Sequence, residues 1–131
     1  MTEADLKRAL VKSITKQGGV AFRMEDRYAV GRPDLYMHAV GLPPFLIEAK
    51  ILHGAKLVCT DLQAEKLKDL HRPPFAFAAI IGWKDPMLYI GQREQPLSGC
   101  LYVPRPSRLE SNDWPISDLL RKQVDRILLS T

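Results

Sequence analysis

The strongest constraint on the fold is a pair of strand-like runs joined by turn-forming residues. The runs cover residues 31–38 and 45–50, and Gly41, Pro43 and Pro44 lie between them. Because glycine and proline interrupt strands and favour turns, this pattern predicts a β-hairpin. The other elements must be arranged around that hairpin.

The segments around the hairpin predict an α/β fold. Phe75 to Ile81 is a continuous apolar run, as expected of a strand covered on both faces, and a helical segment separates it from the hairpin. A helix at that position makes a parallel crossover, so we expect a mixed central sheet of about five strands flanked by helices. The expected order is a helix over residues 2–17, strands over 20–30, 31–38 and 45–50, a helix over 60–70, strands over 75–81 and 86–92, a loop over 95–115 and a C-terminal helix over 115–129.

Length and composition favour a single domain. The chain has 131 residues, of which 46% are hydrophobic, and this is enough for one core. We expect one domain over residues 1–131, with a core over about 2–92 and a loop and helix over about 93–131. No apolar run approaches a membrane span and the N-terminus lacks an apolar signal region, so a soluble, cytoplasmic protein is expected.

The hairpin carries acidic and basic side chains that suit metal-dependent chemistry. Glu48 and Lys50 project from one face of the second strand, because side chains alternate along a strand. Asp34, near the start of the first strand, approaches the same place if the hairpin register puts its side chain on the same face of the sheet. Two carboxylates are hard oxygen ligands that suit Mg²⁺, and the ammonium can hold a water or a phosphate oxygen. The alternative is a surface ion pair beside a turn aspartate, which would contribute little.

With these residues the chain resembles the PD-(D/E)xK nuclease superfamily, and within it the virus-type replication-repair nucleases (VRR-NUC) and the Holliday junction resolvases. Such proteins carry a Glu on the first helix, a Pro-Asp opening the second strand, a Glu-x-Lys on the third strand and, in this branch, a Gln on the next helix. The matching residues are Glu3, Pro33-Asp34, Glu48-Ala49-Lys50 and Gln63. The resemblance covers about residues 2–92 and implies a restriction-endonuclease-like core.

The resemblance also implies a Mg²⁺-dependent DNA endonuclease, in which Mn²⁺ substitutes for Mg²⁺. Asp34, Glu48 and the Ala49 backbone carbonyl, with Glu3 as a further candidate, would hold one or two metal ions. Lys50 would orient the attacking water and stabilise charge in the transition state. The products would carry a 5′-phosphate and a 3′-hydroxyl. No nucleotide cofactor is expected, since no phosphate-binding Gly loop is present.

Helical periodicity tests the two outer residues of the motif. Glu3 lies seven residues before Leu10, on the apolar stripe of the first helix, so its carboxylate is predicted to point toward the sheet. The alternative is a first-turn glutamate that complements the helix dipole. Gln63 falls between Leu67 and Leu70 on the apolar face of the second helix. A buried amide there needs a partner, such as a metal-bound water, a carboxylate, a phosphate or backbone groups.

Charge and small size bear on the substrate. Nineteen Lys and Arg residues and a net charge of +4 are compatible with a polyanionic partner, and Arg32 and Lys56 are the expected phosphate contacts because they are close to the site in sequence. The favoured function is a structure-selective endonuclease for branched DNA, such as Holliday junctions or flaps, in repair or recombination. The alternatives are a restriction-type or DNA-degrading nuclease and a non-catalytic DNA-binding module. The small size is consistent with a phage or mobile-element origin.

A homodimer is the expected assembly. Resolving a four-way junction requires two related strands to be cut, and a two-fold axis places two identical sites at equivalent phosphates. The candidate surfaces are the apolar positions of the first helix and a stripe in the C-terminal helix, and either could instead complete the monomer core. That stripe consists of Ile116, Leu120, Val124 and Ile127.

Overall fold

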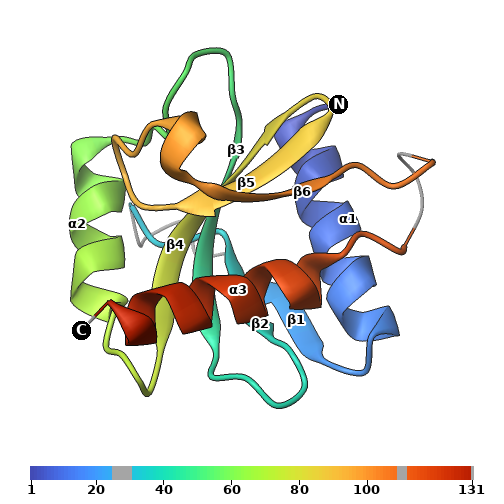
Figure 1. Ribbon diagram of the computed structural model, residues 1–131, viewed down its shortest axis with the longest axis horizontal. Helices are drawn as coiled ribbons and strands as arrows, with labels where there is room; N and C mark the ends of the chain where they lie inside the picture. Colours follow the sequence, from blue (N-terminus) through green and yellow to red (C-terminus); the bar gives the residue numbers. More distant parts are fainter. Residues whose placement is uncertain (25–30, 109–111, 131) are drawn as a thin grey trace.

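The protein folds into a mixed β-sheet with helices on both faces (Figure 1). In the computed structural model, which describes residues 1–24, 31–108 and 112–130, six strands pair in the order β1-β2-β3-β4-β5-β6. β3 and β4 are parallel, and the other neighbouring pairs are antiparallel. The strands are β1 (Val20–Arg23), β2 (Leu35–His38), β3 (Phe45–Ile51), β4 (Phe77–Lys84), β5 (Met87–Gly91) and β6 (Leu101–Pro104). The helices are α1 (Glu3–Lys16), α2 (Asp61–Leu70), α3 (Ile116–Leu129) and the short 3₁₀ helix η1 (Leu97–Gly99).

Helix α1 begins at a capping box and buries its apolar stripe. The Thr2 hydroxyl accepts a hydrogen bond of 3.1 Å from the Asp5 N–H, and the Asp5 carboxylate accepts one of 3.0 Å from the Thr2 N–H. These bonds satisfy two backbone donors that a helix start would otherwise leave open. Leu6, Leu10 and Ile14 are fully buried against the sheet, so the predicted first helix is confirmed.

The apolar stripe of α3 belongs to the monomer core. Figure 1 shows α3 crossing the sheet on the side that also carries α1. Ile116, Leu120 and Val124 are buried in the same hydrophobic cluster as the α1 stripe, and Ile127 packs at its edge. Of the two alternatives for these stripes, coverage of the sheet is the one observed. Neither stripe is therefore an open surface for a second subunit.

Helix α2 and two loops cover part of the opposite face. Leu67 of α2 joins one cluster with Leu52 and Leu57, from the β3–α2 loop, and with Ile80 of β4. The cover lies over β3, β4 and β5, whereas Phe22 on β1 is half exposed. The two faces of the sheet are therefore unequal: α1 and α3 pack on one, and the other is open at the β1–β2 edge.

Two predicted element boundaries differ from the structure. β4 runs from Phe77 through Gly82 to Lys84, whereas the apolar run predicted a strand from Phe75 to Ile81. Gly82 does not end the strand, because it pairs with Lys50 of β3 and with Tyr89 of β5. The Leu52 side chain packs over it, and a Cβ there would be 2.5 Å from the Leu52 Cδ1. The predicted strand over 20–30 is strand up to Arg23, and residues 25–30 lie outside the described residues.

The predicted loop over 95–115 contains a strand that the sequence did not indicate. β6 pairs with β5, and its Leu101 and Val103 lie opposite Ile90 and Leu88. A four-residue edge strand with only two inward-facing positions gives too short an alternation to recognise among prolines and serines.

Within the described part of the chain, none of the helices combines the length and the apolar character needed to span a bilayer.

Candidate active site

The hairpin register brings the two predicted carboxylates together. β2 pairs Leu35 with Ile47 of β3, so Asp34, the residue before β2, lies across from Glu48. Residues directly opposite in antiparallel strands share a face of the sheet. The Asp34 Oδ2 accepts a hydrogen bond of 2.9 Å from the Ala49 N–H, which fixes this carboxylate at the end of the strand pair.

A glycine lets the chain enter β2 close to α2. Gly31 has a φ of +84°, and a Cβ on it would lie 2.6 Å from the Leu62 Cγ on α2. A side chain here would therefore be strained in its backbone and would collide with the helix. The approach of this segment to α2 positions Pro33, which is buried, and then Asp34.

Glu48 is a buried carboxylate on the α2 side of the sheet. The residue is 2% exposed, and its Oε2 has no hydrogen-bond partner among the described residues. Burial and the negative charge of Asp34 raise the pKa of Glu48 to about 8, against the opposing effect of Lys50. A divalent cation held by both carboxylates would offset their mutual repulsion and the cost of burial.

Two lysines flank the carboxylates. The Lys50 Nζ lies 3.6 Å from the Glu48 Oε1, as the strand alternation predicted, and the Lys7 Nζ lies 3.1 Å from the Asp34 Oδ1. Both lysine side chains are only 20% exposed. Sequence reasoning did not place Lys7 at the site. A signal was present, because Lys7 follows Glu3 by four residues and therefore shares its helix face.

Gln63 connects the start of α2 to Glu48. The Gln63 Oε1 accepts a hydrogen bond of 3.0 Å from the Thr60 N–H, and the Thr60 hydroxyl accepts one of 3.1 Å from the Gln63 N–H, forming a capping box. The Gln63 Nε2 donates a hydrogen bond of 2.8 Å to the Glu48 Oε1. Of the partners proposed for this amide, both a carboxylate and a backbone group are present.

Glu3 is exposed to solvent. The predicted orientation of its carboxylate toward the sheet is therefore wrong. Glu3 lies in the first turn of α1, ahead of the buried stripe that begins at Leu6 and one turn before Lys7, whose ammonium contacts Asp34. Among the described residues, no group of three or more His, Cys, Asp or Glu side chains is placed to hold a metal ion. A role for Glu3 in metal binding stays a prediction.

The predicted phosphate contacts lie on the surface. Arg32 is exposed beside the site. Lys56 forms an ion pair with Glu94 at 2.5 Å, and both side chains are about half exposed. Next to it, Arg93 contacts Asp61 at the start of α2 at 2.5 Å. Exposed ion pairs such as Lys56–Glu94 contribute little to stability. A role for Arg32 and Lys56 in binding phosphates stays a prediction.

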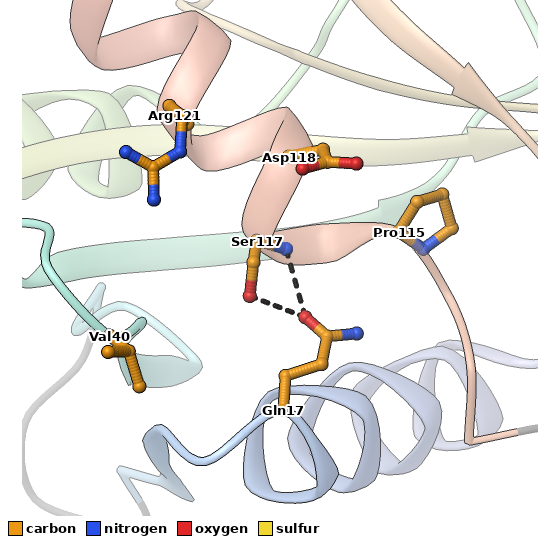
Figure 2. Close-up of a pocket in the computed structure, with 6 residues that line it drawn as sticks. All are labelled: Gln17, Val40, Pro115, Ser117, Asp118 and Arg121. Atoms are coloured by element: carbon orange, nitrogen blue, oxygen red, sulfur yellow. Dashed lines mark hydrogen bonds between the residues drawn. The ribbon is translucent and has the colours of Figure 1, made fainter.

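A surface pocket of about 390 Å³ lies away from these residues. Its lining comes from the end of α1, the segment after β2 and the start of α3, whereas Asp34 precedes β2 at the other end of that strand. Figure 2 shows that the Ser117 N–H and hydroxyl both donate to the Gln17 Oε1, which ties α3 to α1. The pocket therefore lies at a structural junction between helices. Its lining residues are Gln17, Val40, Pro115, Ser117, Asp118 and Arg121.

Comparison with known proteins bears on the fold. Neither a protein-family model nor a curated protein matches the chain. Among solved structures, the chain is similar to Hjc of Archaeoglobus fulgidus, a Holliday junction resolvase from an archaeal hyperthermophile, with a TM-score of 0.52 and 18% identity, covering 76% of this chain and 84% of that chain. At this identity the likeness concerns the fold alone. Together with the six-stranded mixed sheet and flanking helices of the described residues, it confirms that the chain has the predicted α/β, restriction-endonuclease-like fold.

Proposed function

We propose that this protein is a metal-dependent, structure-selective DNA endonuclease that hydrolyses phosphodiester bonds at branched DNA, such as Holliday junctions or flaps. The observation that carries the proposal is the buried Glu48 carboxylate, set opposite Asp34 and contacted by Lys50 and Gln63. These are the residue types, in the chain order, of the PD-(D/E)xK motif of the virus-type and resolvase branches. The fold shared with a Holliday junction resolvase supports branched DNA as the substrate.

The carboxylates fit a divalent metal ion, Mg²⁺ or Mn²⁺. The Glu48 Oε2 is buried without a hydrogen-bond partner in the described residues, and the carboxylate of Asp34 raises its pKa. Asp34 and Glu48, with the Ala49 carbonyl as a further predicted ligand, would hold the ion. When bound, it would supply positive charge for a phosphate oxygen and lower the pKa of a water molecule.

The protein's own side chains would orient the reacting groups. Gln63 holds one Glu48 oxygen by its N–H, and Lys7 and the Ala49 N–H hold the two Asp34 oxygens. Both carboxylates are thereby fixed before a substrate arrives, and such preorganisation lowers the reaction barrier. The Lys50 ammonium, beside Glu48, would direct the attacking water and stabilise negative charge that develops on the phosphate.

The proposal includes a homodimer that acts in the cytoplasm. Two sites related by a two-fold axis would cut the two related strands of a junction. Because the apolar stripes of α1 and α3 are buried in the monomer, the dimer contact would use other surfaces. Sedimentation at micromolar concentration, with and without DNA, measures the assembly state.

The test is cleavage of linear, flap and four-way-junction DNA with Mg²⁺, Mn²⁺ or EDTA. Cleavage of the branched DNAs should require metal and should leave a 5′-phosphate. It should be lost in Asp34→Asn and Glu48→Gln and strongly reduced in Lys50→Ala. Glu65→Gln, an exposed glutamate of α2, is the matched control and should cut normally. Near-normal cleavage by Asp34→Asn would refute the proposal. A stable monomer that prefers linear duplex would refute the resolvase activity but not the nuclease chemistry.

A further inference from the structure

Aromatic side chains lie on the open part of the sheet face that carries the carboxylates. Phe22 of β1 and Tyr36 of β2 pair directly and stack, with ring centroids 4.9 Å apart and ring planes inclined by 17°. His38 meets Tyr36 edge-on, with centroids 6.4 Å apart. Phe22 is 50% exposed and His38 is exposed. These three residues are called the aromatic strip below.

The strand register places the aromatic strip beside the candidate active site. Tyr36 lies opposite Leu46 of β3, which precedes Glu48 by two residues, and Asp34 precedes Tyr36 by two residues. Residues two apart on a strand share a face and are separated by about 7 Å. The strip therefore begins one residue pair away from the carboxylates, and α2 packs on β3 and β4 rather than over β1.

The strip has the chemistry of a surface for nucleobases. Flat aromatic rings stack on any base, and alanine substitution of such a ring costs about 1–3 kcal/mol per base. A base joined through its sugar to a phosphate at Asp34 and Glu48 lies within reach of the neighbouring residue pair. In an intact duplex that base is stacked inside the helix, so only an unpaired base can reach the rings.

We propose that the aromatic strip stacks an unpaired nucleobase next to the scissile phosphate, and that this contact selects DNA with unpaired bases at a flap or branch. The inference rests on the proposed function, since it takes the carboxylates as the position of the phosphate. Phe22 supplies the open ring face, and Tyr36 supports Phe22 from β2.

Photo-crosslinking tests the contact directly. DNAs that carry 5-iodouracil at single unpaired positions near a flap or branch are bound in EDTA and irradiated, and the crosslinked peptide is identified by mass spectrometry. The crosslink should fall on Phe22 or Tyr36. Binding to these DNAs should weaken roughly 5- to 100-fold in Phe22→Leu, which keeps an apolar side chain but removes the ring, and should be retained in Phe22→Tyr.

Phe75→Ala is the control, because Phe75 is 81% exposed but precedes β4, at the end of the sheet remote from Glu48. It should bind and cut as the unmodified protein does. Crosslinks elsewhere, or equal binding by Phe22→Leu, would overturn the inference even if cleavage is normal. A dimer that dissociates on Phe22→Leu would also overturn it, since the strip would then be a subunit contact. Absence of cleavage on every DNA would instead refute the proposed function, while crosslinking in EDTA still reports on the strip.

Discussion

Glu48 should make the stability of the metal-free protein fall as the pH rises. Its pKa is raised from an ordinary value of 4.5 to about 8, chiefly by burial and then by Asp34. The folded protein therefore binds this proton more tightly than the unfolded chain does, and the free energy of unfolding decreases with pH between these two values. At about 1.4 kcal/mol for each factor of ten in proton affinity, ionised Glu48 costs about 4–5 kcal/mol of stability above pH 8.

The variant Glu48→Gln isolates this effect, because it keeps the shape and the acceptor for Gln63 but cannot ionise. Near pH 5 the two proteins should have similar unfolding free energies. Near pH 9, in EDTA, the variant should be more stable by about 4–5 kcal/mol, as measured by urea denaturation across a pH series. Titrating groups that do not contact Glu48 cancel in the difference. Glu65→Gln, at an exposed position, should follow the unmodified protein at every pH.

The outcome that would refute this reasoning is a pair of parallel stability profiles for the unmodified protein and Glu48→Gln. In that case Glu48 would ionise without cost, and its burial would not carry the consequence assigned to it. Added Mg²⁺ gives a second measurement. It should raise the melting temperature of the unmodified protein near pH 9 but should have little effect on Glu48→Gln, since binding stabilises only a folded state that holds the ion.

Three further results are expected. Lys50→Ala should lower the single-turnover cleavage rate by about 10²- to 10³-fold with little change in DNA affinity; an equal loss in affinity would show a binding role instead. Asp34→Ala should be less stable than Asp34→Asn by about 1–3 kcal/mol in urea denaturation, because only the amide keeps an acceptor for the Ala49 N–H; equal stability would mean that water replaces the carboxylate. Gln63→Ala should lose about 1 kcal/mol of stability, because the capping box of α2 is lost, and should cut at least about tenfold more slowly in single-turnover assays. Glu3→Ala, at an exposed site, should lose less activity than Gln63→Ala. The reverse order would restore Glu3 to the mechanism.

The hairpin and its carboxylates could be predicted because both depend on local pattern. Strand alternation placed Glu48 and Lys50 on one face of β3, and the turn residues predicted that β3 pairs with the segment of Asp34. The register that sets Asp34 across from Glu48 was left open by the sequence and is given by the structure. The exposure of Glu3 could not be predicted, because helical periodicity identifies an apolar stripe but not the turn of the helix at which burial begins. Lys7 shares the helix face of Glu3, but its contact with Asp34 also depends on how α1 packs and on the length of the lysine side chain.

The roles of the α3 stripe and of β6 also depended on tertiary structure. A stripe of apolar residues is equally suited to a monomer core and to a subunit contact, and only the burial of Ile116 and Leu120 against the α1 side of the sheet distinguishes them. Leu101 and Val103 are recognised as strand residues only from their pairing with β5. In both cases the sequence of one element does not indicate which other element it will contact.

The capping box of α2 restricts its third residue more than helix formation requires. Either Gln or Glu at that position can accept the N–H of Thr60, so the helix start alone would tolerate both. The second contact removes this freedom, because only the amide can also donate to Glu48. A glutamate at position 63 would preserve the helix while bringing a third carboxylate to the carboxylate pair. A residue that looks interchangeable from its local structure is thus made specific by a neighbouring strand, and an exchange usually regarded as conservative would alter the charge of the site.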